Sequence, residues 1–159
     1  NFKKAILEFN HPSSQVFLQD NPYNNGGAVL SIPDKILEEP VIFVCANDTV
    51  EDYLLEDFNR RIQDENPQGL FLGQERQDYF NGGYLDIDPN GFLCNFIEKP
   101  GRGKQPSNLI NIVYQYYKNP LLFKETIKEL IDSNSNITTS YQDAIQCMIS
   151  SNVSKYMSD

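Results

Sequence analysis

The sequence offers few of the residues that usually carry metal-ligand or nucleophilic chemistry. It has one histidine, His11, in a Pro/Ser-rich segment with no evident catalytic partner. Of its three cysteines, none belongs to a C-x-x-C pair, and Cys45 lacks a neighbouring base, so thiol catalysis is not expected. Because Cys45, Cys94 and Cys147 lie in apolar runs, we expect small buried residues of a reducing compartment such as the cytoplasm.

Long apolar runs and an excess of positive charge are also lacking. No run approaches the length of a membrane-spanning helix, and no secretion signal is visible. The 22 acidic residues outnumber the 13 basic ones, which gives a net charge of −9. This charge disfavours nucleic acids and anionic membranes as partners. It suits a site where divalent metal ions meet phosphates, although solubility is the simpler explanation.

The chain does contain enough apolar residues for one folded core. It has 159 residues, of which 40% are hydrophobic, with 10 phenylalanines and 9 tyrosines. No internal repeat and no interdomain linker is visible, so we expect a single domain over residues 1–159.

Helical and strand patterns alternate along the chain. The pattern predicts helices at residues 2–9, 28–37, 51–66, 120–132 and 140–150. It predicts strands at residues 15–19, 41–46, 69–74, 83–88, 92–97 and 109–117. The apolar run "VIFVCA" at 41–46 is typical of a strand that is buried on both faces of a parallel sheet. The order therefore predicts an α/β fold with a mostly parallel sheet.

Two aspartates are candidates for a metal site. Asp48 directly follows the apolar run, where ligands bind in such sheets, and a carboxylate there can hold Mg²⁺. The alternative is that Asp48 caps the helix that follows. Asp143 lies at the start of the last helix. There it either interacts with the positive end of the helix dipole or shares a metal with Asp48.

The stretch "GGYLDIDPNGFLCNFIEKP" reads as a hairpin that ends in a carboxylate, an ammonium group and a proline. Lys99 supplies a point charge for a phosphate, and Glu98 can accept hydrogen bonds from sugar hydroxyls. Pro100 is expected to keep Lys99 extended. The alternative is a solvent-exposed strand end without a ligand.

These segments together resemble the sugar-1-phosphate nucleotidyltransferases, which include glucose-1-phosphate thymidylyltransferases and mannose-1-phosphate guanylyltransferases. The resemblance runs from about residue 15 to 149. It rests on Gly83 followed by "DPNG" and "EKP", on "VIFVCANDT", on "SYQDAI", and on "QDNPYNNGG" with its Gln19.

The resemblance implies a Rossmann-like nucleotidyltransferase fold and a reaction. A nucleoside triphosphate and a sugar 1-phosphate would give an NDP-sugar and pyrophosphate. Asp48 and Asp143 would hold Mg²⁺, with Asp48 and Lys99 as catalytic residues. Gly83, Glu98 and Lys99 would bind the sugar phosphate, and Gln19 would contact the base.

The chain also departs from the family pattern. Asn24-Asn25 replaces a Gly-Thr pair, Asn47 replaces a glycine, and no loop of the type G-G-x-G-T-R-L is present. We therefore expect the C-terminal portion of the family fold, active in the complete protein and inactive as these 159 residues alone. The alternatives are a non-catalytic regulatory or assembly module, and a glycosyltransferase with Asp48 as its metal ligand. The oligomeric state stays open, and a homo-oligomer is compatible with the sequence.

Overall fold

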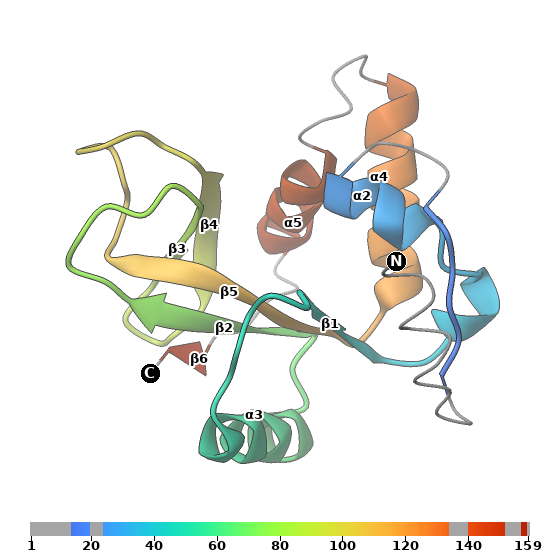
Figure 1. The fold of residues 1–159 in the computed structure, drawn as a ribbon, viewed down its shortest axis with the longest axis horizontal. Coiled ribbons are helices and arrows are strands. Elements are labelled where there is room, and N and C mark those ends of the chain that lie inside the picture. Colours follow the sequence, from blue (N-terminus) through green and yellow to red (C-terminus); the bar gives the residue numbers. More distant parts are fainter. Residues whose placement is uncertain (1–13, 20–23, 134–139, 152–156, 159) are drawn as a thin grey trace.

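A computed structural model describes residues 14–19, 24–133, 140–151 and 157–158 (Figure 1). The helix expected at residues 2–9 and the lone His11 lie outside these ranges. No helix in the described ranges is both long and apolar enough to cross a bilayer.

A six-stranded mixed sheet forms the centre of the molecule. Its strands are β1 (Val41–Val44), β2 (Gly69–Glu75), β3 (Gly83–Ile87), β4 (Leu93–Glu98), β5 (Leu109–Tyr117) and β6 (Met157–Ser158). The order is β4-β3-β5-β2-β6, and β1 also pairs with β5. Every pairing is antiparallel except that of β2 with β6. The prediction of a mostly parallel sheet was therefore wrong.

The error has a topological cause. Helix α3 (Asp52–Glu65) connects β1 to β2, as a crossover between parallel strands requires. Strands β1 and β2 do run in the same direction, because each pairs antiparallel with β5, and Val41 and Gly69 both lie opposite Tyr117. After the β3–β4 hairpin the chain returns as β5, which lies between β1 and β2.

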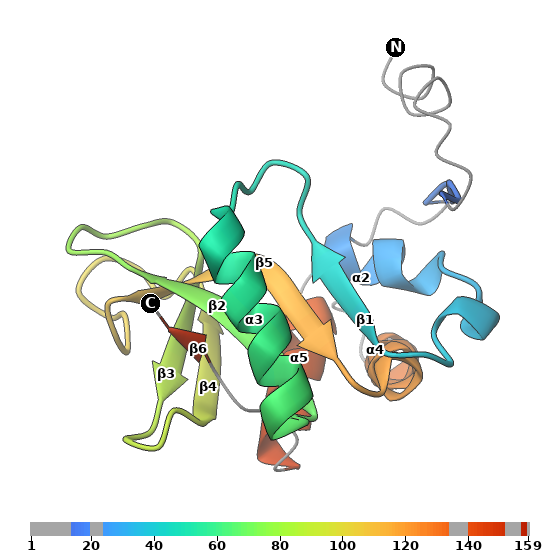
Figure 2. The same ribbon diagram turned by 90° about the horizontal axis from the view of Figure 1, so that it is seen from below.

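Helices cover both faces of the sheet. Helix α3 packs on one face, and α2 (Asn24–Leu30), α4 (Pro120–Ser133) and α5 (Ser140–Ser150) lie on the other (Figures 1 and 2). Alternate residues of β2 separate the two cores: Leu70 and Leu72 pack with Phe58 of α3, whereas Phe71 joins the larger cluster that contains α4 and α5.

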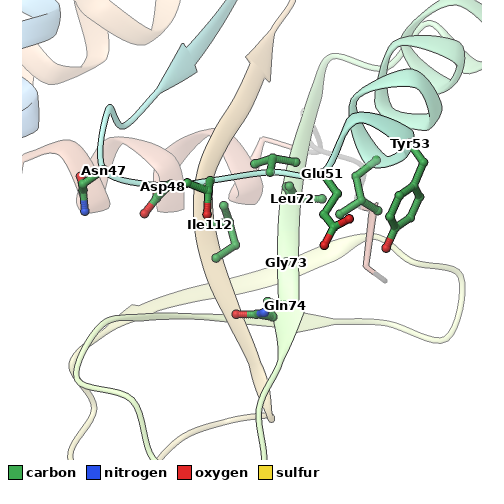
Figure 3. A pocket seen from close by; sticks show the side chains of 11 residues that line it. Asn47, Asp48, Glu51, Tyr53, Leu72, Gly73, Gln74 and Ile112 are labelled. Carbon is green, nitrogen blue, oxygen red and sulfur yellow. The ribbon is translucent and has the colours of Figure 1, made fainter.

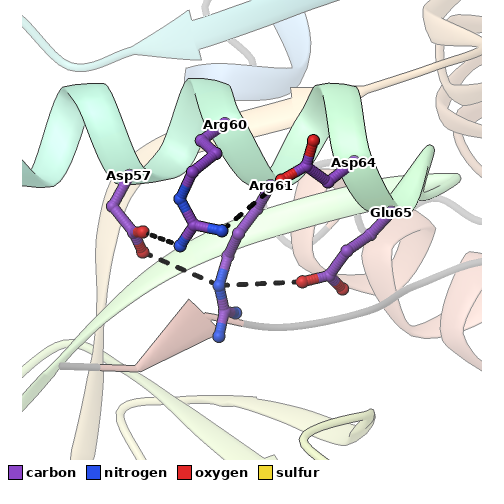
Figure 4. A network of polar contacts seen from close by, with 5 residues as sticks. All are labelled: Asp57, Arg60, Arg61, Asp64 and Glu65. Atoms are coloured by element: carbon purple, nitrogen blue, oxygen red, sulfur yellow. Dashed lines mark hydrogen bonds and ion pairs between the residues drawn. The ribbon is translucent and has the colours of Figure 1, made fainter.

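The outer surface of α3 carries charged side chains at helical spacing (Figure 4). Arg60 pairs with Asp57 and, at 3.5 Å, with Asp64. Arg61 lies 3.7 Å from Asp57 and 3.8 Å from Glu65. Such surface pairs one turn apart contribute only about 0.2–0.5 kcal/mol each. This charged face of α3 lies in solvent, and the helix packs on the sheet through Phe58.

Most predicted elements are present within a few residues of the expected bounds. The exceptions lie early in the chain. Residues 14–19 form no strand, and the helix expected at 28–37 is replaced by α2 and a short 3₁₀ turn, Asp34–Ile36. Pro33 explains the break, since it has no backbone N–H to donate to a continuing helix.

Two burial predictions were also wrong. Strand β1 ends at Val44, whose side chain is 53% exposed, so the run is not buried on both faces. Cys94 and Cys147 are exposed, and Cys45 is half-buried. Cys94 is the extra residue of a bulge in β4, because Asn95 lies opposite Asp86 and Leu93 opposite Ile87, and its side chain is left outside the core that Leu93 and Phe96 join.

Candidate functional site

Asp48 is fixed against the edge of strand β5. Its Oδ2 atom accepts a hydrogen bond of 3.0 Å from the backbone N–H of Val113. The N–H of Cys45 donates to the carbonyl of the same Val113 at 2.9 Å. Beyond β1, the chain thus continues to hydrogen-bond the backbone of β5, through the Cys45 N–H and then through the Asp48 side chain. Asp48 is not the cap of α3, whose N-cap residue is Glu51.

A cavity of about 670 Å³ lies beside Asp48, on the face of the sheet that α3 covers (Figure 3). Leu72, Gly73 and Ile112 contribute from the strands, and Asn47, Glu51 and Gln74 add polar groups. This volume is in the range of small-molecule sites. The carboxylate and amide oxygens suit hydroxyl groups or a hard cation.

A smaller cavity of about 140 Å³ lies on the opposite face. It is lined by residues of α2, β1, β5 and α5, namely Asn25, Ala28, Val29, Phe43, Val44, Cys45, Val113 and Tyr141. Because Asp48 lines the larger cavity and Val113 the smaller one, their hydrogen bond lies at the boundary of the two.

The predicted sugar-phosphate residues meet at the end of the β3–β4 hairpin. Gly83 lies opposite Glu98 in the antiparallel register. A Cβ atom on Gly83 would come within 2.7 Å of the Phe96 ring and 3.2 Å of Glu98 Oε2. Glycine is therefore needed there, because the two side chains fold over its backbone.

Lys99 has a backbone conformation that the sequence did not predict. Its φ is +47°, in the left-handed region, although a following proline normally favours an extended residue. Its N–H donates to the carbonyl of Gly82 at 3.0 Å, and its Nζ lies 3.4 Å from Glu98 Oε1. This turn brings the ammonium and the carboxylate together at the strand end.

The other two predicted residues belong to other segments, Gln19 outside any helix or strand and Asp143 in α5. Gln19 is exposed and donates from its Nε2 to the carbonyl of Asn24, the first residue of α2, at 3.0 Å. Asp143 is exposed in the first turn of α5, the position that favours the helix dipole. Asp143 does not line the larger cavity, but Tyr141, two residues earlier, lines the smaller one.

The oxygen-rich donors around Asp48 fit a hard cation that retains other ligands. In the described ranges, no three His, Cys, Asp or Glu side chains are grouped closely enough to form a metal cage. Mg²⁺ does not require one, since it is usually held by one or two carboxylates together with substrate phosphates and waters. Asp48, oriented by the Val113 N–H, is one carboxylate with the chemistry that such an ion requires.

Comparison with known proteins decides the family. Residues 3–158 match the model of the family described as nucleotidyl transferase. The chain belongs to the nucleotidyl transferase family. No curated protein sequence matches it.

Solved structures with the nucleotidyl transferase fold agree. An apo UDP-glucose pyrophosphorylase superposes with a TM-score of 0.63 at 19% identity, over 82% of this chain and 50% of that one. A UTP-bound enzyme of the same name from Acinetobacter baumannii gives 0.55 at 17%, over 87% and 50%. A Bacillus anthracis protein assigned as a glucose-1-phosphate thymidylyltransferase gives 0.63 at 16%, over 91% and 55%. The chain thus spans about half the length of these solved chains.

Sequence reasoning missed the residues that support the predicted ones. Val113 contributes only backbone atoms to Asp48, which no side-chain pattern can indicate. Gln115 was detectable in principle, because it is the polar residue between tyrosines in "VYQYY". Its side chain is fully buried and bonds to Tyr141 of α5.

Proposed function

We propose that this nucleotidyl transferase domain contributes the sugar-phosphate site of an enzyme that makes an NDP-sugar and pyrophosphate. The substrates would be a nucleoside triphosphate and a sugar 1-phosphate. The observation that carries the proposal is the constellation of Gly83, Glu98 and Lys99 at the hairpin end. The solved UDP-glucose pyrophosphorylases support it, since one of them holds UTP.

Each residue has a role that follows from its chemistry. The Glu98 carboxylate accepts hydrogen bonds from sugar hydroxyls, and the Lys99 ammonium neutralises the sugar phosphate. Gly83 keeps the backbone of β3 within reach of Glu98. Gln19, beside the start of α2, would hydrogen-bond the base with its side-chain amide.

Asp48 and Asp143 would hold Mg²⁺, which when bound neutralises charge on the phosphate oxygens. Asp48 enters this role already oriented by the Val113 N–H. The residues of the site would hold both substrates in line, so positioning and charge neutralisation would be the main contributions to the rate.

The test is pyrophosphate release by the complete protein with a panel of triphosphates and sugar 1-phosphates. We expect Lys99→Met to raise the KM for the sugar phosphate at least tenfold. Lys104→Met is the matched control, since Lys104 is exposed on the loop after the hairpin and is assigned no role. Equal KM values for the two variants would refute the role of Lys99.

A non-catalytic module of the same fold is the second candidate. One observation favours it: the Phe96 ring and the Glu98 carboxylate lie over Gly83, where a ligand would have to approach the backbone. Calorimetric titration of the complete protein separates the two. Metal-dependent triphosphate binding supports the enzyme, whereas binding of a sugar ligand alone supports the module.

A further inference from the structure

Two loops at the open end of the β3–β4 hairpin carry positive charge in a strongly acidic protein. The loop at residues 76–82 joins β2 to β3, and the loop at residues 99–108 joins β4 to β5. Together they hold four of the 13 basic residues, Arg76, Lys99, Arg102 and Lys104, and one of the 22 acidic residues, Asp78. The two loops therefore form a local positive region that attracts anions, although the chain as a whole has a net charge of −9.

Two guanidinium groups of these loops lie over aromatic rings. The Cζ atom of Arg76 is 5.7 Å from the centroid of the Phe80 ring, and that of Arg102 is 6.0 Å from the centroid of the Tyr79 ring. Both arginines are exposed, and within the part of the chain that the structure describes neither takes part in an ion pair. A guanidinium group that stacks on a ring keeps N–H donors at its edge, where they can bind phosphate oxygens.

Strand β3 holds the two aromatic rings in place. Tyr79 stacks on Tyr84 of β3, with 6.2 Å between the ring centroids. Tyr84 is 2% exposed, and its hydroxyl accepts from the N–H of Phe80 at 2.7 Å and donates to the carbonyl of Phe80 at 3.0 Å. The N–H of Arg76 donates to the carbonyl of Asn108 at 2.8 Å, which joins the two loops. A ligand that binds here therefore meets a platform that is already ordered, which favours its affinity.

The platform lies on the opposite face of the hairpin from the proposed sugar-phosphate residues. A Cβ atom on Gly83 would point toward Phe96 and Glu98, and Phe96 belongs to the core cluster on the side of α4 and α5. Tyr84 follows Gly83 in β3, and successive side chains of a strand point to opposite faces. Tyr84 and the stacked Tyr79 thus lie on the other face, so an anion bound there would be separate from a bound sugar phosphate.

We propose that Arg76 and Arg102 form a second anion site, which binds the oligophosphate chain of pyrophosphate or of a nucleotide. Two guanidinium groups over adjacent rings suit a ligand with two or more phosphates, because each group can bind one phosphate through paired N–H donors. Phe80 is 40% exposed, so it also offers a nucleotide a surface on which its base can stack. This site goes beyond the proposed function, because it uses neither the sugar-phosphate residues nor a metal ion.

Calorimetric titration of the full chain with sodium pyrophosphate tests this site. EDTA is present throughout, so that metal-dependent binding at Asp48 does not contribute. We expect Arg102→Met to weaken binding about tenfold, since it removes charge-assisted hydrogen bonds. Arg102→Lys should weaken it by a similar factor, because a lysine ammonium cannot bind a phosphate through paired N–H donors.

Lys104→Met is the matched control, because it removes one exposed charge from the same loop. An exposed charge without a direct contact contributes little, so we expect its affinity to stay within about twofold of wild type. Because Arg102 and Lys104 are both exposed, the midpoint of urea unfolding should be the same for wild type and all three variants. A loss of binding would then not reflect a loss of folding.

The outcomes decide between a built site and attraction by charge alone. Absence of pyrophosphate binding to the wild type would overturn the proposal. Equal losses in Arg102→Met and Lys104→Met would overturn it too, because binding would then follow the number of charges. Uridine triphosphate in EDTA distinguishes the two ligand sources, and Arg102→Met should weaken its binding as well. Tighter binding than pyrophosphate would support a nucleotide as the ligand, whereas equal affinities would support the oligophosphate alone.

Discussion

Asp48 Oδ2 lies 3.0 Å from the backbone nitrogen of Val113, a residue 65 positions later in the chain. The Asp48 carboxylate thereby accepts a hydrogen bond from the backbone of β5, beyond Val44, the last residue of β1. Because this N–H is partly buried, Asp48 has a role in folding that is separable from any role in binding.

Replacement of Asp48 should separate these roles. Asp48→Ala leaves the Val113 N–H without its acceptor, so we expect the free energy of unfolding to fall by about 1–2 kcal/mol. Asp48→Asn retains an oxygen acceptor, and we expect a loss below about 1 kcal/mol. Urea denaturation measures both, with the exposed neighbour Thr49→Ala as control. In the complete protein both Asp48 variants should lose pyrophosphate release. Equal stability of the Ala and Asn variants would contradict the first role.

Gly83→Ala should impair both stability and sugar-phosphate binding. The added methyl group would overlap the Phe96 ring, and relief of such overpacking costs about 1–3 kcal/mol. The double variant Gly83→Ala/Phe96→Leu removes that overlap but leaves the 3.2 Å approach to Glu98 Oε2. We expect the second substitution to restore part of the melting temperature without restoring the KM for the sugar phosphate. Recovery of both would mean that the close approach of residue 83 to Glu98 does not govern sugar-phosphate binding.

Lys99 combines a strained backbone with a proposed binding charge. A left-handed conformation costs a non-glycine residue about 1–2 kcal/mol, so Lys99→Gly should raise the free energy of unfolding by up to about 1 kcal/mol. Lys99→Met keeps the strain and loses an exposed ion pair, and should change stability by less than about 0.5 kcal/mol. Both variants should weaken sugar-phosphate binding. A glycine variant no more stable than the methionine variant would argue against the strain.

The hairpin turn gives a pH-dependent prediction. The pKa of Asp88 is lowered mainly because the N–H of Phe92 donates to its carboxylate, and the N–H of Asn90 does so too. A lowered pKa in the folded state stabilises the protein above the ordinary aspartate pKa of about 4, and this contribution disappears as the pH falls through the folded pKa. Asp88→Asn should therefore be less stable than wild type at pH 7, and the difference should shrink below pH 4. A difference that is independent of pH would exclude this linkage.

The sequence predicted the local elements well where one physical signal dominated. The apolar stripe of α3 and the β-forming run of β5 gave nearly the observed bounds, and "DPNG" gave the hairpin turn, closed by the Gly91 N–H on the Asp88 carbonyl at 2.9 Å. These signals are properties of neighbours in the chain. Strand order is not such a property, so the insertion of β5 between β1 and β2 could not be read from alternation.

The candidate site was predictable in part for the same reason. Glu98 and Lys99 are adjacent in sequence, and the hairpin register sets Gly83 opposite Glu98, so this group follows from local pattern. The surroundings of Asp48 do not, since they depend on the backbone of Val113. The conformation of Lys99 also escaped prediction, because the bond from its N–H to Gly82 outweighs the preference that Pro100 imposes.

The central place of β5 sets the order in which the chain can fold. In the described sheet β1 and β2 share no hydrogen bonds and meet only through β5. During synthesis, a nascent chain that ends before Leu109 would contain β1, α3 and β2 but not the strand with which β1 and β2 both pair. Contacts between partners this far apart in sequence require a long loop to close before any pairing is gained, which slows folding. We therefore expect the apolar residues of β1 and β2 to stay exposed until residues 109–117 have been synthesised. Chaperone binding to the nascent chain should be strongest during that interval.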